Sequence, residues 1–541
     1  MPARLAGASS DWPEMASGIV FFILAALVAA TFQDYGISWD EMVQNTYGKK
    51  LLEYYASGFR DLSAFNYSNL YLYGGFFDLV AALINHVSPF GEYETRHLLG
   101  GLVFLTGLFG AWRLADLLAG SRAALIALVC LASTPVLYGH GFINPKDSPL
   151  AWLHVWVLYF GCRILARPEQ PSFATLAGFS VSLGLALGTR VIAVEFLALL
   201  AGVLVIYISQ QTAKAENVTT FARQTWRIVR PLALATLAAL PIMVALWPWS
   251  AQGPQNIIQA LEIFSRFGWR PLVLWGGELL PSGKLPADYL TQLLLFKLPE
   301  YALVGIVLAL AFAVAAARRE RWALLGQSHA RQYGYVALSA IAPVVGFIVM
   351  RPVVYNGLRH FLFIVPPLVI LSAIGLDKTL TFAAARRNSY AIIVGTFLTL
   401  GVGLQVARMV QLHPYEHVGY NALIGGIAGA ETRYELDYWG TSLGEASRGL
   451  VTFARKNHLE NPSVFVCGDQ ESAAYFLPKD FKITDQLWQA DFYIGINDPP
   501  CRYRFDEPKR AIYEVRREGV PLSYVIDLRP PAIVPALSSR N

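Results

Sequence analysis

Three acidic side chains lie at the edges of apolar runs in the first third of this chain. Asp40 and Glu41 form a dipeptide in QDYGISWDEMVQNTYG, a few residues after the apolar run 15–32. Asp147 lies in the polar segment HGFINPKDSP, between two other apolar runs. Burying a carboxylate at a membrane edge costs free energy, so such residues usually have a function. The pattern predicts acid–base chemistry at a membrane surface.

Asp40 is a candidate general base, which would take a proton from an acceptor hydroxyl or amine as that group attacks an activated carbon. The alternative is a helix N-cap, because Asp40 precedes MVQNTYGKKLLEYYASGF, a sequence typical of an amphipathic helix. Glu41 would orient Asp40 or a metal ion. Asp147 lies two residues before Pro149, so helix capping is the alternative for Asp147 as well.

Basic side chains on the same predicted side of the membrane are few, so each is informative. They are Arg96, which begins the second apolar run, Lys146 beside Asn144, Arg190 within an apolar stretch, and Arg359 at the start of the tenth run. Each could simply extend toward the lipid headgroups. Gathered around one cavity they would bind a lipid phosphate, since guanidinium matches phosphate in a bidentate manner. Arg190 in particular needs a partner for its charge.

The composition indicates an integral membrane protein. The 541 residues are 55% hydrophobic and 15% charged, with a mean hydropathy of +0.42, whereas soluble proteins carry roughly 25% charged residues. About twenty apolar residues span a bilayer. This rule predicts about eleven spans, at 15–33, 97–117, 123–139, 149–166, 172–189, 191–209, 231–248, 297–316, 333–350, 361–377 and 390–409. The shorter apolar stretch 70–86 is expected to lie at the interface without crossing.

The distribution of Lys and Arg predicts the orientation of these spans. With the N-terminus in the cytoplasm, the short loops between 113 and 122, 163 and 167, 214 and 230, 318 and 331, and 378 and 387 face inward and are dense in Lys and Arg. Asp40, Glu41 and Asp147 then face outward. The first run has no small-residue cleavage site, so it is expected to remain as an anchor.

The composition changes after residue 410. Residues 411–541 contain strand-like segments at 463–468, 491–496 and 524–528 and a helical segment at 443–457, but no spanning run. We therefore predict two domains, a membrane domain 1–410 and a small extracytoplasmic α/β domain 411–541, which is an ordinary domain size. Cys467 and Cys501 lie in the second domain and could form a disulfide.

Several segments together resemble the GT-C superfamily of membrane glycosyltransferases. They are DYGISWDE, NLYLYGGFFDLV followed by RHLLGGLVF, YGHGFINPKDSPLA and NGLRHFLFIVPPLVIL, with HPYEHVGYNALIGGIAGAETRYELDYWGTS after the last span. The chain is most similar to family 39, which includes protein O-mannosyltransferases and the lipid A aminoarabinose transferase. The resemblance extends to about residue 442. NLYLYGG replaces the HPPLY-like string of many relatives, which puts the donor-lipid contacts of that segment in doubt.

The resemblance implies an all-α polytopic bundle of the GT-C type with a small C-terminal α/β domain. It implies an inverting glycosyltransferase of a bacterial inner membrane, with a polyprenyl-phosphate sugar as donor and a lipid, polysaccharide or protein as acceptor on the periplasmic side. Asp40 would be the base, Glu41 would complete the motif, and Asp147 would be the second acid. Arg96, Arg359, Lys146 and Arg190 would hold the donor phosphate. Dependence on a divalent cation varies in the superfamily and stays open here.

Two other functions are compatible with a polytopic protein. A transporter or flippase for lipid-linked sugars would place charges at mid-bilayer depth and often contains inverted repeats. A non-catalytic assembly protein would use the same fold for binding alone. The acids at span edges favour the enzyme, and nothing in the sequence indicates a nucleic-acid partner.

Overall fold

The computed structural model describes residues 11–212, 217–253, 255–265, 268, 271–320, 327–499, 501–503 and 511–530. The chain divides into two compact units. Unit 1 consists of residues 1–35 and 43–434, and unit 2 consists of residues 36–42 and 435–541. The short segment 36–42 therefore belongs with the C-terminal part of the chain, although it lies near the N-terminus in sequence.

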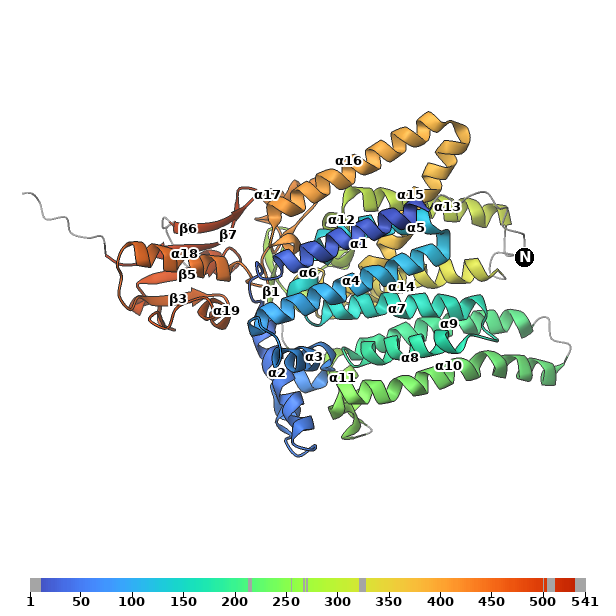
Figure 1. Ribbon diagram of the computed structural model, residues 1–541, viewed down its shortest axis with the longest axis horizontal. Coiled ribbons are helices and arrows are strands. Elements are labelled where there is room, and N and C mark those ends of the chain that lie inside the picture. The colour runs from blue at the N-terminus through green and yellow to red at the C-terminus, as the bar shows by residue number, and fades with distance from the viewer. Residues whose placement is uncertain are drawn as a thin grey trace, which may run out of the picture. The chain divides into compact units, whose positions relative to one another are not determined.

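Unit 1 is a bundle of long apolar helices (Figure 1). Among the described residues, nine helical segments are long and apolar enough to cross a membrane. Their helices are α1 (Trp12–Thr31), α4 (Glu92–Ala119), α7 (Asp147–Ala166), α9 (Val194–Thr212), α10 (Val218–Leu246), α13 (Glu300–Glu320), α14 (Ser328–Met350), α15 (Val365–Arg386) and α16 (Asn388–Leu412). The prediction of a polytopic all-α membrane protein is confirmed.

Within the described ranges the number of candidate spans is nine or ten, fewer than the eleven predicted from the sequence. The run 123–139 is divided between α5 (Ser121–Ala132) and α6 (Pro135–Ile143), which are bent by 64°. The break falls at Pro135, because proline begins a helix readily but cannot continue the hydrogen bonding of one. The run 172–189 forms α8 (Phe173–Leu187), whose 15 residues are short for a span.

The segment 70–86 forms a 3₁₀ turn (Leu70–Leu72) and the ten-residue helix α3 (Phe76–Asn85). Its two glycines allow close contact with the ends of α8 and α10. A Cβ on Gly74 would lie 2.0 Å from the Gly188 carbonyl oxygen, and the Gly75 amide donates to the Leu246 carbonyl at 2.8 Å. The helix is too short to span a bilayer, and its place at the interface stays a prediction.

Small residues also allow the long helices of unit 1 to pack closely. A Cβ on Gly107 of α4 would lie 2.2 Å from the Trp152 indole of α7, and a Cβ on Gly305 of α13 would lie 2.0 Å from the Ser372 hydroxyl of α15. Membrane helices use such residues because dispersion contacts replace the hydrophobic effect inside the lipid.

Unit 2 is built on a five-stranded sheet with the strand order β4-β3-β5-β7-β6. The strands are β3 (Ser463–Cys467), β4 (Lys482–Ile483), β5 (Phe492–Ile496), β6 (Ala511–Arg517) and β7 (Val520–Asp527). β3 pairs in parallel with β4 and β5, whereas β7 pairs antiparallel with β5 and β6. Helix α18 (Leu443–Lys456) contacts β5, β6 and β7. The three strands predicted from the sequence correspond to β3, β5 and β7.

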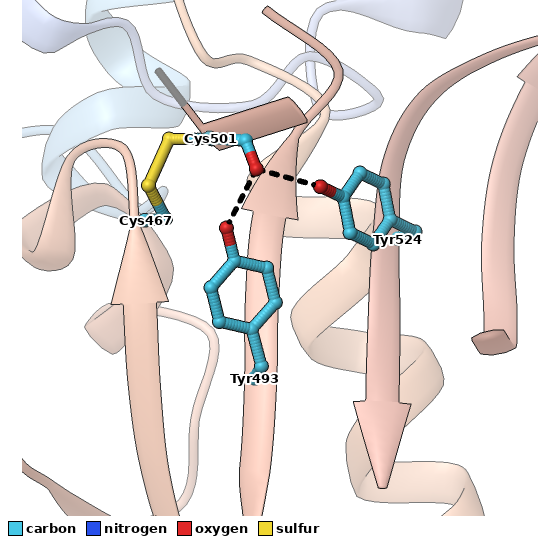
Figure 2. The surroundings of a disulfide bond; sticks show 4 residues. All are labelled: Cys467, Tyr493, Cys501 and Tyr524. Carbon is cyan, nitrogen blue, oxygen red and sulfur yellow. Dashed lines mark hydrogen bonds between the residues drawn. A yellow bond between two sulfur atoms is a disulfide. The ribbon is translucent and has the colours of Figure 1, made fainter. Parts of the chain in front are cut away.

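A disulfide joins Cys467, at the end of β3, to Cys501, after β5. The Cys501 carbonyl accepts hydrogen bonds from the hydroxyls of Tyr493, at 3.1 Å, and Tyr524, at 2.9 Å (Figure 2). The pairing suggested by the sequence is thus present in the structure.

The division between the units falls at 434/435, not at the 410/411 boundary that composition suggested. Residues 411–434 pack with unit 1 although they are not apolar enough to span. The Asn421 amide group, for example, donates to the carbonyls of Leu295, at 2.6 Å, and Leu298, at 2.7 Å. The change in composition marks the end of the last apolar run, whereas unit 1 continues as far as residues 411–434 contact its helices.

Candidate functional site

Asp147 is the centre of a charged cluster in unit 1. It begins α7, is 4% exposed, and forms an ion pair with Arg190. The Asn144 side chain donates to the Asp147 carboxylate at 3.1 Å and accepts from the Asp147 amide at 2.9 Å. This local turn competes with helix formation before residue 147 and so fixes where α7 starts. The carboxylate is therefore held from both its own loop and the end of α8.

Two cations of the cluster contact one aromatic ring. The Lys146 ammonium lies 4.4 Å and the Arg190 guanidinium 5.4 Å from the centre of the Tyr73 ring. Arg190 follows α8 in an extended conformation, and its side chain is 16% exposed. The face of an aromatic ring attracts cations, so Tyr73 helps to bring these two positive charges together. Sequence reasoning did not identify Tyr73 as part of the site.

Arg359 and His360 complete the cluster from the 3₁₀ turn Arg359–Ile364. Both lie within electrostatic range of Asp147, and His360 is also within range of Lys146 and Arg190. The Nδ1 atom of His360 is buried with no hydrogen-bond partner among the described residues. In the part of the chain that the structure describes, three permanent cations thus lie near one carboxylate, an arrangement suited to binding an anion.

Four of the residues predicted from the sequence, Lys146, Asp147, Arg190 and Arg359, therefore lie in one cluster. Their roles in catalysis or phosphate binding stay predictions. The signal that found them was charge inside or beside apolar runs, because such charges need partners.

Arg96 lies in a different environment. Its guanidinium is 0% exposed, donates to the Asp78 carboxylate at 2.6 Å, and lies 5.3 Å from the centre of the Phe77 ring. Its Nε and Nη1 atoms have no hydrogen-bond partner among the described residues. Its ion-pair partner is thus an acid of α3, and a role with the donor phosphate stays a prediction. Asp78 lies within the apolar stretch 70–86.

Asp40 and Glu41 belong to unit 2, in the first turn of α2 (Trp39–Ala56). Glu41 is 1% exposed, and its carboxylate accepts from the Ser38 amide at 2.8 Å. Glu41 is therefore the side chain that turns back to the start of this helix, as in a capping box. Asp40 is the second helical residue and is partly exposed. A cavity shared by Asp40 and Asp147 stays a prediction.

A second titratable cluster in unit 1 was not recognised from the sequence. His413 lies between two acids, with its Nδ1 2.7 Å from Glu416 and its Nε2 3.0 Å from Asp34. The Tyr35 hydroxyl donates to Glu416 at 3.3 Å. Burial lowers the pKa of His413, but the hydrogen bonds and charges of Glu416 and Asp34 outweigh burial, and the pKa is raised. The spacing of His413 and Glu416 was the available signal.

Unit 1 contains His140, His413 and His417, and histidine is a common metal ligand. Among the described residues, no group of three or more His, Cys, Asp or Glu side chains is placed to hold a metal ion. The rings of His140 and His417 lie 6.0 Å apart, centre to centre.

An apolar groove of about 450 Å³ lies between α4, α7 and α8. Its lining includes Phe76, Trp152, Trp156, Phe160, Val181 and Leu185. Along α7, Trp152 follows Asp147 by five residues, which corresponds to roughly 8 Å of helix rise. The groove thus lies along the two helices whose ends carry Asp147 and Arg190.

Comparison with known proteins is informative at the level of the fold. Residues 77–249 match the family model described as dolichyl-phosphate-mannose-protein mannosyltransferase, and a search of curated protein sequences finds no significant match. The structure is similar to ArnT from Cupriavidus metallidurans bound to undecaprenyl phosphate, with 14% identity, a TM-score of 0.50, and coverage of 96% of this chain and 98% of that one. The apo state of ArnT matches with 16% identity, the same TM-score and the same coverage.

The chain has a GT-C type of fold, like that of ArnT. The apo oligosaccharyltransferase from Archaeoglobus fulgidus aligns less well, with 12% identity and a TM-score of 0.46, over 89% of this chain and 65% of that one. The segment of this chain that matches the family model includes Arg96, Lys146, Asp147 and Arg190, whereas Asp40, Glu41 and Arg359 lie outside it.

Proposed function

We propose that this multi-pass membrane protein is an inverting glycosyltransferase that moves a sugar from a polyprenyl-phosphate donor to a lipid, polysaccharide or protein acceptor. The observation that carries the proposal is the cluster of cations near Asp147, beside an apolar groove between membrane helices. A lipid phosphate presents the complementary chemistry, an anionic group on a long apolar chain. The likeness to ArnT solved with undecaprenyl phosphate supports the same donor class.

In this proposal Arg190, Arg359 and Lys146 hold the phosphate, and the polyprenyl chain follows the groove. Asp147 keeps Arg190 in place through their ion pair, so the cations are oriented before the donor binds. Preorganised charges stabilise a leaving group without reorganising during the reaction, and losing one such contact typically costs about 10²–10³ in rate. The cluster is suited to that task because the developing charge is on phosphate oxygens.

The reaction is a direct displacement. An acceptor oxygen or nitrogen attacks the anomeric carbon, its proton passes to the Asp40 carboxylate, and the bond from the anomeric carbon to the phosphate oxygen breaks. The bonding electrons leave with the polyprenyl phosphate, whose charge the cations stabilise. Attack from the face opposite the phosphate inverts the anomeric centre. The proposal requires Asp40 to reach the acceptor while the donor phosphate lies on the Asp147 cluster.

The sugar must meet its acceptor where the polyprenyl phosphate emerges from the lipid. The Lys- and Arg-rich loops predict that Asp40 and Asp147 face away from the cytoplasm. We therefore place the reaction on the periplasmic face of a bacterial inner membrane. Cysteines introduced at position 60, which is exposed and lies in the same predicted outer segment as Asp40, and at position 320 test this placement. An impermeant thiol reagent added outside should label position 60 and not 320.

Binding of undecaprenyl phosphate to the purified protein tests the donor site. Arg359→Ala should weaken binding at least tenfold, because a charged hydrogen bond contributes about 1.5–3 kcal/mol. Arg122→Ala is the control, since Arg122 is a cation of unit 1 that pairs with Asp377 and lies outside the Asp147 cluster. Equal affinity of the two variants would contradict the proposed site. Movement of the lipid-linked sugar across vesicles without transfer would favour a flippase.

A further inference from the structure

The segment that carries Asp40 is fastened within unit 2. We call residues 36–42 the strap and residues 437–442 the Asp437 loop. The Trp39 amide donates to the Trp439 carbonyl at 3.1 Å. A Cβ on Gly36 would lie 2.0 Å from the Thr441 carbonyl oxygen, and a Cβ on Gly440 would lie 2.6 Å from the Trp39 indole nitrogen. The strap backbone therefore touches the loop backbone at Gly36, and the Trp39 ring of the strap lies against Gly440 of the loop.

One buried carboxylate builds the Asp437 loop. Asp437 is 1% exposed, and it accepts hydrogen bonds from the Thr441 amide at 3.1 Å, the Thr441 hydroxyl at 3.0 Å and the Ser442 amide at 2.7 Å. The Ser442 carbonyl in turn accepts from the Ser523 hydroxyl of β7 at 3.1 Å. Asp437 therefore closes a turn whose far end is attached to the central sheet.

The position of Gly440 depends on this turn. Gly440 has a φ of +67°, a conformation that other residues adopt only at a cost, and it leaves room for the Trp39 ring. A buried carboxylate is also costly unless it is fully hydrogen-bonded. The positive φ of Gly440 and the buried carboxylate of Asp437 both restrict which residues the loop can contain, and both shape the surface against which the strap lies.

We propose that Asp437 is a positioning residue for the glycosyl transfer: it shapes the loop that holds the strap, and the strap holds the proposed base Asp40. The inference rests on the proposed function. It assigns the C-terminal unit a direct part in the reaction, because the first turn of α2 is fastened to that unit. Asp437 itself donates or accepts no proton in the reaction.

The expected effect is on the rate of the chemical step. A general base must lie within hydrogen-bond reach of the proton it takes, and a displacement of about 1 Å can cost roughly 10²-fold. Loosening the strap should therefore lower kcat at least tenfold and change the KM for the donor less than twofold. The donor phosphate is assigned to residues outside unit 2, so its binding should persist.

The test compares Asp437→Ala and Gly36→Ala with controls of the same type in full-length protein. Asp491→Ala is the control for Asp437, because Asp491 also accepts from a backbone amide and a hydroxyl, both of Ser463, at 2.8 and 2.7 Å. Gly519→Ala is the glycine control, since its φ is +81° and an added Cβ would meet no atom within 4 Å. The rate of hydrogen exchange at the Trp39 amide measures how firmly the strap is held. The rate of glycosyl transfer is measured in membranes of expressing cells, as the release of polyprenyl phosphate from the lipid-linked sugar.

We expect both strap variants to speed exchange at Trp39 at least tenfold and to lower kcat, while both controls leave exchange and kcat within twofold. Thr441→Ser should retain both properties, and Thr441→Val, which lacks the hydroxyl, should shift both in the direction of Asp437→Ala. Unchanged exchange in Asp437→Ala, or faster exchange with an unchanged kcat, would overturn the inference. Full transfer by Asp40→Asn would instead overturn the assigned base, and that outcome is distinguishable because exchange at Trp39 stays slow in Asp40→Asn.

Discussion

Variants of the ion pair between Asp147 and Arg190 distinguish the contribution of these residues to stability from their contribution to donor binding. We predict the effects of Arg190→Met, Asp147→Asn and the double variant on stability and on donor binding. The Asp147 side chain is 5% exposed and that of Arg190 is 16% exposed, so the pair is buried. Removing one partner of a buried pair costs about 3–5 kcal/mol because the other charge is left uncompensated.

For Arg190→Met we expect a loss near 3 kcal/mol, the lower end of this range. The Asn144 amide and the nearby Arg359 still stabilise the Asp147 carboxylate after Arg190 is removed. The double variant removes both members of the ion pair and should recover about 2 kcal/mol of that loss, which is an ordinary coupling for residues in direct contact. Undecaprenyl phosphate binding should behave differently and stay at least tenfold weaker in the double variant, since the cation is still missing.

The stabilities are measured by denaturant titration of the purified protein and the affinities by binding of undecaprenyl phosphate. Arg122→Met with Asp377→Asn supplies the matched cycle at another ion pair of unit 1. That cycle should leave the affinity unchanged. Recovery of full affinity in the Arg190→Met, Asp147→Asn variant would refute the assignment of Arg190 to the phosphate. Absence of any coupling in stability would refute the buried ion pair.

Two further predictions concern stability. The folded-state pKa of His413 is raised above its ordinary value, so its stabilising contribution is complete below the unfolded-state pKa and is lost as pH rises through the folded-state pKa. The difference in stability between the wild type and His413→Gln should therefore shrink from pH 6 to pH 9. A difference that grows over this range would contradict the pairing of His413 with Asp34 and Glu416. The Cys467–Cys501 disulfide closes a loop with a sequence separation of 34, for which chain entropy gives about 4 kcal/mol. Cys467→Ser should therefore lower the unfolding midpoint of unit 2 in the full-length protein, whereas Cys130→Ser, at a free cysteine of unit 1, should leave that midpoint unchanged.

The membrane bundle could be predicted from the sequence because apolar length reports directly on burial in lipid. Nine of the predicted runs are long apolar helices. The bend at Pro135 and the short helix α8 were missed because an average over an apolar run does not register where hydrogen bonding breaks. Strands β3, β5 and β7 were found because each is a short apolar run between polar segments.

The candidate site was only partly accessible to sequence reasoning. Lys146, Asp147, Arg190 and Arg359 stood out as charges beside apolar runs, and the structure gathers them. The ion-pair partner of Arg96, Asp78, could not be predicted, because the packing of α3 against α4 cannot be read from the sequence. Contacts across hundreds of residues, such as Asp34 with His413, were invisible for the same reason.

The strap is the clearest case of that limit. In sequence it reads as a loop after the first span, and its backbone contacts are with residues 437–442. Gly36 and Gly440 carry no chemical signal, and their importance appears only when the opposing carbonyl and indole are in place. The local sequence pattern therefore identified Asp40, whereas the contacts between the strap and the Asp437 loop became visible only in the structure.

Mass spectrometry of the glycolipids and glycoproteins of cells that produce the wild-type protein or Asp40→Asn, at matched expression, tests the central claim most directly. We predict that the variant accumulates a polyprenyl-phosphate sugar and that one class of envelope molecule loses the mass of that sugar. Identical glycan profiles in the two cells, with no accumulated donor, would contradict it.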